Sequence, residues 1–180
     1  MDLPGSTYLY SLAAISITFV GFSTLVVVLR QTFGGTMSSL DIFITRVFIQ
    51  LSFIVAASAM VPNLLSLFAL PQPVIWRFSS AIAAIPSFLF GVTYPWRRRR
   101  ASGARTPIGV WLDIGVLLIA AIILIANAIG IAFEPGPGPF AVGLTVILFV
   151  SGWAYLQALN VLLRQHLIRG QSEHDSSLER

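Results

Sequence analysis

Residues 114–133 read IGVLLIAAIILIANAIGIAF, twenty consecutive positions without an ionisable side chain. About 20 helical residues, each rising about 1.5 Å, are needed to cross the hydrocarbon core of a bilayer, which is about 30 Å thick. Four further stretches free of ionisable side chains have similar or greater length: residues 8–29, 47–70, 78–96 and 135–163. The sequence therefore predicts five transmembrane spans.

The composition of the chain excludes an ordinary soluble domain. Of its 180 residues, 56% are apolar and only 10% are charged, whereas roughly 25% charged residues are typical of soluble proteins. Inside a bilayer the backbone must satisfy its own hydrogen bonds, and the alternating pattern of a transmembrane barrel is missing from this sequence. We therefore expect an all-α, polytopic integral membrane protein: a compact bundle of five transmembrane helices.

The predicted organisation is one transmembrane domain over residues 1–169, followed by a polar tail at residues 170–180 that we expect to be disordered in the cytoplasm. Proline and glycine at residues 34–35, 71–73, 95, 107 and 134–139 mark the span boundaries. The predicted spans are residues 8–30, 40–61 with an extension to 70, 74–96, 108–133 and 139–164.

Local signals refine two of these spans. Ser38-Ser39-Leu40-Asp41 resembles a capping box, so the second helix should begin near Ser39. Pro62 predicts that this helix kinks or ends there, and Pro86 predicts a bend in the third helix.

The arginines predict an orientation with the amino terminus outside and the carboxyl terminus inside. This orientation places Arg30, Arg105, Arg164, Arg169 and the run at residues 97–100 on the cytoplasmic side, and only Arg77 opposite. Trp76 and Trp96 should mark the outer and inner interfaces as parts of an aromatic belt. All eleven basic residues are arginine, which hints at a GC-rich coding sequence. We therefore expect an integral protein of a bacterial cytoplasmic (inner) membrane.

Small residues spaced for close helix packing occur in every predicted span. In lipid such residues let helix backbones approach closely. We expect these stripes either to build one monomeric bundle or, for one stripe within 78–96 or 135–163, to join copies of the chain. The stripes are Ala14, Thr18 and Gly21; Ser52 and Ala56; Ala83, Ser87 and Gly91; Ala126 and Gly130; Ala154 and Ala158.

Five polar residues fall in the predicted cytoplasmic half of the spans: Arg46, Gln50, Asp113, Gln157 and Asn160. Helix rise gives Arg46 and Asp113 a similar depth, so one hypothesis pairs them, with the amides adding hydrogen bonds. Alternatively, these side chains reach the interface or play structural roles, or they line a path for an ion, proton or solute. Asn127, in the outer half, is expected to donate an interhelical hydrogen bond.

The run Arg97, Arg98, Arg99 and Arg100 admits two interpretations. It can set the topology of the chain, or it can bind anionic lipid head groups. Nucleic acid is not expected as a partner, because the run lies beside a span and outside any aromatic-rich binding domain. The expected partners are the lipid bilayer and either a second copy or another membrane protein.

Catalytic, cofactor and metal sites are not expected. The chain has no cysteine, and its two histidines, His166 and His174, lie beyond the last span. A nucleophile within a span would therefore lack a general base, and no metal-ligand cluster is present in the sequence. We expect a non-catalytic membrane component, an accessory subunit or scaffold. The alternative is a small oligomeric channel or transporter with a polar vestibule in its cytoplasmic half.

Overall fold

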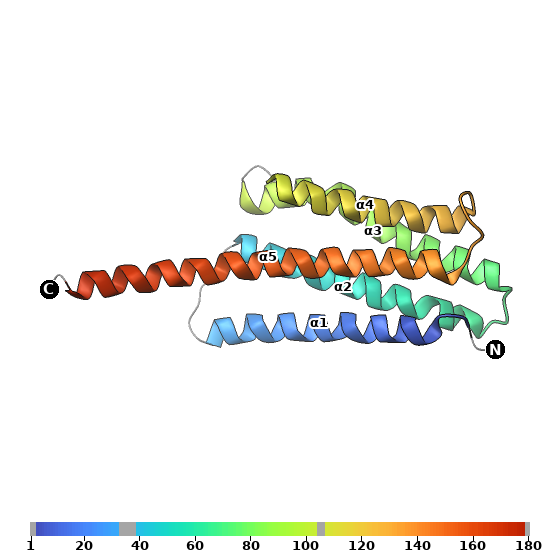
Figure 1. The fold of residues 1–180 in the computed structure, drawn as a ribbon, viewed down its shortest axis with the longest axis horizontal. Helices are drawn as coiled ribbons and strands as arrows, with labels where there is room; N and C mark the ends of the chain where they lie inside the picture. The colour runs from blue at the N-terminus through green and yellow to red at the C-terminus, as the bar shows by residue number, and fades with distance from the viewer. Residues whose placement is uncertain (1–2, 33–38, 104–106, 179–180) are drawn as a thin grey trace.

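The computed structural model describes residues 3–32, 39–103 and 107–178, with side chains up to residue 157 except at 26, 29–31, 40, 41 and 102. The regular structure in these ranges is entirely helical (Figure 1). Each helix contains a segment long and apolar enough to cross a membrane. The five helices are α1 (Ser6–Thr32), α2 (Ser39–Ser66), α3 (Gln72–Ser102), α4 (Ile108–Ile129) and α5 (Pro137–Leu178).

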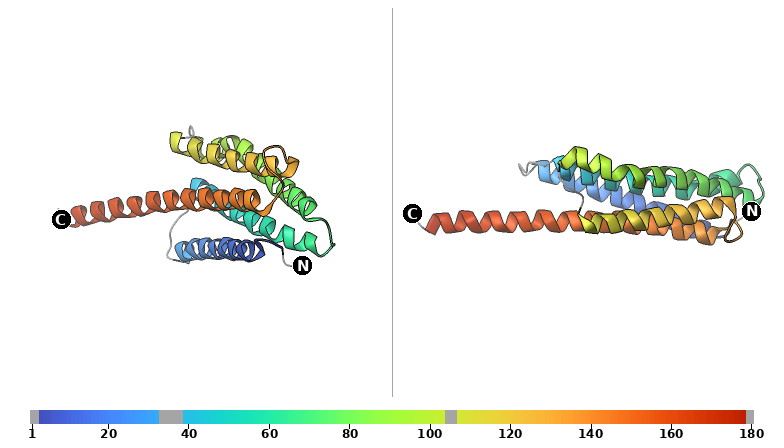
Figure 2. Two further views of the ribbon diagram at one scale, coloured as in Figure 1. Left: turned by 45° about the vertical axis from the view of Figure 1, so that its right-hand side comes forward. Right: turned by 90° about the horizontal axis from the view of Figure 1, so that it is seen from above.

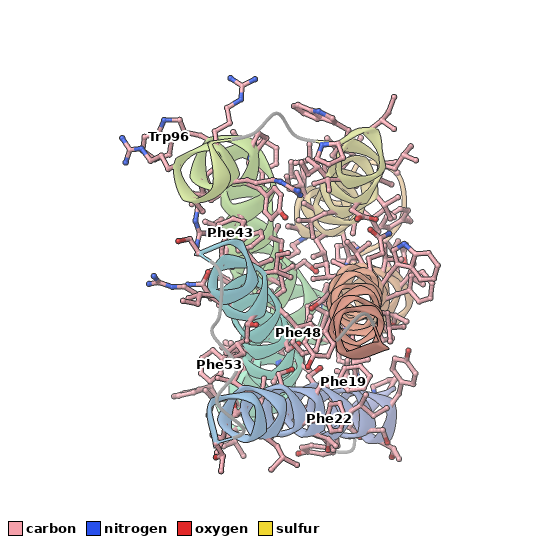
Figure 3. All side chains as sticks on the ribbon, turned by 90° about the vertical axis from the view of Figure 1, so that its left-hand side faces the viewer. Phe19, Phe22, Phe43, Phe48, Phe53 and Trp96 are labelled. Carbon is pink, nitrogen blue, oxygen red and sulfur yellow. The ribbon has the colours of Figure 1, made fainter. Side chains whose placement is uncertain are left out.

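Consecutive helices run in opposite directions along one long axis, and α5 extends beyond the others toward the carboxyl terminus (Figures 1 and 2). Helix α2 packs against α1, α3 and α5, and α4 packs against α3 and α5. Helices α2, α3, α4 and α5 therefore form a closed ring. Helix α1 lies on the outside of α2 and touches α5 only slightly, as the end-on view shows (Figure 3).

The interior of this ring is filled by apolar side chains from all four helices. Val55, Ala83, Leu124, Leu144 and Ile147 have no exposed surface. Each of the four helices of the ring contributes at least one of these side chains. The ring is thus held together by direct side-chain packing along its axis.

Close helix approach in the ring is made possible by glycine on either side of α4. A Cβ atom at Gly143 of α5 would lie 2.7 Å from Leu124 Cγ, and one at Gly91 of α3 would lie 2.9 Å from Leu118 Cδ2. Ala83 and Ser87, two turns and one turn before Gly91, are also fully buried. The small residues that the sequence placed on one face of this helix therefore do lie in the packed interior.

The stripe predicted on the first helix behaves differently. Ala14, Thr18 and Gly21 are exposed, and no atom lies within 4 Å of a Cβ built at Gly21. Helix α1 instead buries Leu9 and Leu12 against its neighbours. Spacing identifies residues that share a face of a helix, but it does not say which face meets a neighbour.

Trp76 is also placed differently from the prediction. Its side chain is only 1% exposed and packs against the Phe140 ring, with 5.7 Å between the ring centroids. Trp76 is therefore part of the core and does not mark an interface with the surroundings. Trp96, at the other end of α3, is 57% exposed.

Two boundaries agree with the sequence: Pro71 precedes the first residue of α3, and Pro107 precedes the first residue of α4. The boundary predicted at Pro95 is wrong, because α3 continues through it to Ser102. A proline removes one hydrogen bond from the helix but leaves the turns on both sides intact. Helix α3 ends where Gly103 adopts a left-handed conformation (φ 65°) and donates its N–H to the Arg99 carbonyl.

The prolines that were predicted to kink or end helices lie within them, and residues 170–178 of the predicted tail belong to a helix. Pro62 lies inside α2, which ends four residues later, and Pro86 lies inside α3. The sequence predicts disorder from residue 170, but in the structure the backbone of α5 continues as helix to Leu178. No proline after Pro139 interrupts this helix. The glycine pair at residues 34–35 and Ser38 of the predicted capping box lie outside the described residues.

We expect Gly143→Ala to lower the free energy of unfolding by about 1–3 kcal/mol, because the new methyl group must displace the buried Leu124. Denaturation in mixed micelles measures this change. Gly115→Ala on α4 is the matched control, since nothing lies within 4 Å of its added Cβ. Equal stability of the two variants would show that the α4–α5 contact is not close-packed.

Candidate functional site

The arginine run lies on the last turns of α3. Since successive helical residues point about 100° apart, Arg97, Arg98, Arg99 and Arg100 face different directions. Arg99 and Arg100 are both exposed, and the Arg100 guanidinium lies 3.6 Å from the centre of the Trp96 ring. The four arginines therefore do not form one continuous patch.

Arg97 faces α2. Its Nη2 donates a hydrogen bond of 2.8 Å to Oε1 of Gln50, and its guanidinium lies 5.1 Å from the centre of the Phe90 ring. Because α2 and α3 are antiparallel neighbours, the last turns of α3 lie beside the first half of α2 (Figure 1). This pair was not predicted, because the third span was expected to end at residue 96. The available signal was the spacing of Phe90, Thr93 and Arg97, which places these three residues on one face of a continuous helix.

Arg97 and Gln50 line one end of a groove of about 500 Å³ between α2 and α3. Thr93 adds a hydroxyl at the same end. Phe53 and Leu89 line the remainder with apolar surface. The groove therefore combines a cationic, hydrogen-bonding end with an apolar channel.

A second group of polar side chains lies where α3 faces α4. Tyr94 packs against Phe43 and Phe90, with ring centroids 5.6 Å and 6.1 Å away. Electrostatic interactions link the Tyr94 hydroxyl to Arg98 and to Asp113 of α4. Asp113 thus belongs to an environment formed by α3 and α4.

The predicted pairing of Arg46 with Asp113 is not formed. Helices α2 and α4 lie across the ring from each other and make no contact, and Arg46 is exposed. Gln157 of α5 is exposed as well, and the side chain of Asn160 lies outside the described residues. Helix rise gave these residues a similar depth, but depth does not specify which helices are neighbours.

Asn127 of α4 makes the most extensive side-chain hydrogen bonds of the described residues at the opposite end of the ring. Its Nδ2 donates to Ser80 Oγ at 2.7 Å and to the Gly136 carbonyl at 3.1 Å, and its Oδ1 accepts from the Gly136 N–H at 3.0 Å. The Asn127 side chain is fully buried. It joins α3, α4 and the segment leading into α5, which confirms the predicted interhelical hydrogen bond.

A further groove of about 440 Å³ lies between α1 and α5 and is almost wholly apolar. Phe19 and Phe22 of α1 and Phe48 of α2 line it (Figure 3). The Phe48 ring stacks on Tyr155 of α5, with 4.5 Å between centroids. This groove offers contact to apolar chains but no charged group.

Comparisons of the chain with protein-family models, curated proteins and solved structures find no match. Among the described residues, no group of three or more His, Cys, Asp or Glu side chains is placed to hold a metal ion. The Arg97–Gln50 groove is therefore the candidate site that the geometry itself defines.

We expect Asn127→Ala to lower the free energy of unfolding by about 2 kcal/mol, because the Gly136 amide group and the Ser80 hydroxyl lose buried partners. Asn63→Ala is the matched control, since the buried Asn63 Nδ2 has no hydrogen-bond partner; its change should be well below that of Asn127→Ala. Detergent denaturation of both variants measures the difference. Equal losses would argue against the Asn127 bridge.

Proposed function

We propose that this chain is an integral protein of a bacterial cytoplasmic membrane and acts there as a non-catalytic component, an accessory subunit or scaffold. In this proposal five helices cross the bilayer. The amino terminus and the α4–α5 connection face outward, and the arginine end of α3 faces the cytoplasm.

The observation that carries the proposal is the outer face of α3. Six large side chains at helical spacing are 47–61% exposed: Phe78, Ile82, Ile85, Leu89, Val92 and Trp96. The opposite face of α3 is buried and carries apolar or small side chains, among them Trp76, Ala83 and Ala84. A helix that is apolar all round is either enclosed in a large core or surrounded by lipid, and none of the described residues of this chain covers this face.

Charge supports the proposed orientation. The last turns of α3, which carry the four arginines of residues 97–100, lie at one end of the structure, whereas the start of α1 and the α4–α5 connection, which contains Glu134, lie at the other (Figure 1). Cytoplasmic loops of membrane proteins carry an excess of arginine and lysine. The arginine end is therefore assigned to the cytoplasm.

The polar groups of the ring support a scaffold role. Asn127 bonds to Ser80 and Gly136, and Gln50 bonds to Arg97. Ser52 of α2 and Ser151 of α5 approach each other at 3.5 Å between hydroxyl oxygens. These bonds join different helices, or α4 to the segment before α5, and those of Asn127, Ser52 and Ser151 lie in the packed interior, so they contribute to holding the helices together. A channel or transporter would need such groups to face a water-filled path.

The orientation can be tested with single cysteines, because the chain has none of its own. Ile131 near the α4–α5 connection is 78% exposed and Ile108 at the start of α4 is 85% exposed, so they form a matched pair. A membrane-impermeant maleimide added to intact spheroplasts should label Ile131→Cys and should reach Ile108→Cys only after permeabilisation. Labelling of Ile108→Cys alone in intact spheroplasts would reverse the proposed orientation.

The scaffold role can be tested by flux into liposomes that contain the purified chain. We expect small ions and solutes to enter no faster than they enter empty liposomes. A variant carrying Arg46→Gln and Asp113→Asn is the control, because it removes both charges of the predicted polar cluster. Flux through the unmodified protein that is lost in this variant would favour the channel or transporter.

A further inference from the structure

We infer that the groove between α2 and α3 binds one anionic phospholipid, with its phosphodiester at Arg97 and Gln50 and an acyl chain along Phe53 and Leu89. This inference rests on the proposed membrane location. It goes further by assigning a specific site and ligand class to one surface of the ring.

The lining of the groove matches the two parts of a phospholipid. Arg97 and Gln50 supply donors at one end, where the Thr93 hydroxyl itself donates to the Leu89 and Phe90 carbonyls. Pro86, the lining residue of α3 farthest from Arg97, lies eleven residues away, or about 16 Å by helix rise. Over this length the other lining side chains are aliphatic or aromatic, as an acyl chain requires.

Charge selects the kind of head group. The two partners that hold Arg97, the Gln50 amide and the Phe90 ring, are both neutral, so neither balances the positive charge of the guanidinium. Gln50 occupies only one edge of a group with five N–H donors. The remaining donors suit a phosphate, which guanidinium groups bind through paired hydrogen bonds. Arg46, one turn before Gln50 on α2, adds a second exposed positive charge nearby.

The position of Arg97 along α3 agrees with a head group. Arg97 directly follows Trp96, the last residue of the exposed apolar stripe of α3. In the proposed orientation this is the level at which the cytoplasmic leaflet changes from acyl chains to phosphates. Basic pockets between transmembrane helices on this side are a known type of anionic-lipid site.

The size of the groove favours a lipid over a protein partner. Its volume of about 500 Å³ is in the range of small-molecule sites. An α-helix with its side chains is about 10 Å across, so a helix from a second copy could lie over the groove but not within it. A lipid can fill both the polar end and the apolar channel.

The test is native mass spectrometry of the full chain released from nanodiscs that contain equal amounts of phosphatidylglycerol and phosphatidylcholine. We expect the protein to retain one phosphatidylglycerol in preference to phosphatidylcholine. Arg97→Gln should reduce this preference about tenfold, because it removes the charge that holds the phosphate. Arg99→Gln, with the same charge change on an exposed side chain of the same turn, should leave it within about twofold.

A second pair of variants tests the acyl-chain half. Leu89→Trp fills the apolar channel and should reduce lipid retention, whereas Ile85→Trp, one turn away and outside the lining, should not. Equal retention in all variants, equal losses in both arginine variants, or dimers in place of bound lipid would overturn the lipid site while leaving the membrane location intact. A chain that stays monomeric in water without detergent would instead overturn the membrane proposal.

Discussion

Large apolar side chains line the outward faces of these helices as well as the packed interior, and the rest of the structure depends on this constraint. In water the exposed stripe of α3 would be strongly unfavourable, because apolar surface is stabilised by about 25 cal/mol for each Å² removed from water. A lipid surrounding also requires the backbone to satisfy its own hydrogen bonds, and the described residues meet this requirement. Their regular structure is helical, and a helix satisfies its N–H and C=O groups internally.

In the proposed membrane location, the surrounding lipid changes what can hold the helices together. Lipid tails are as apolar as leucine, so burying leucine against leucine gives little preference for the folded state, and close packing and hydrogen bonds become decisive. Both are found where α4 meets its neighbours. Gly91 and Gly143 let the backbones approach, and Asn127 supplies hydrogen bonds to α3 and to the segment before α5. These contacts hold α4 between α3 and α5.

The sequence predicted those features that depend on a single helix. The lengths of the stretches without ionisable side chains predicted five helices, and Pro71 and Pro107 predicted where α3 and α4 begin. Features that depend on which helices are neighbours were not predictable. The Arg46–Asp113 hypothesis used depth alone and failed because α2 and α4 lie across the ring, and Trp76 proved to be buried by Phe140 of a distant segment. The Arg97–Gln50 pair was missed because Pro95 does not end α3.

The central claim, that α3 crosses a bilayer, is tested most directly by nitroxide labels at Phe78, Ile85 and Trp96 in reconstituted membranes. These positions lie on the exposed face at the start, middle and end of the stripe. The label at Ile85 should collide most often with oxygen, which concentrates in the hydrocarbon, and least often with a water-soluble nickel chelate. Equal access of the nickel chelate to all three positions would contradict the account.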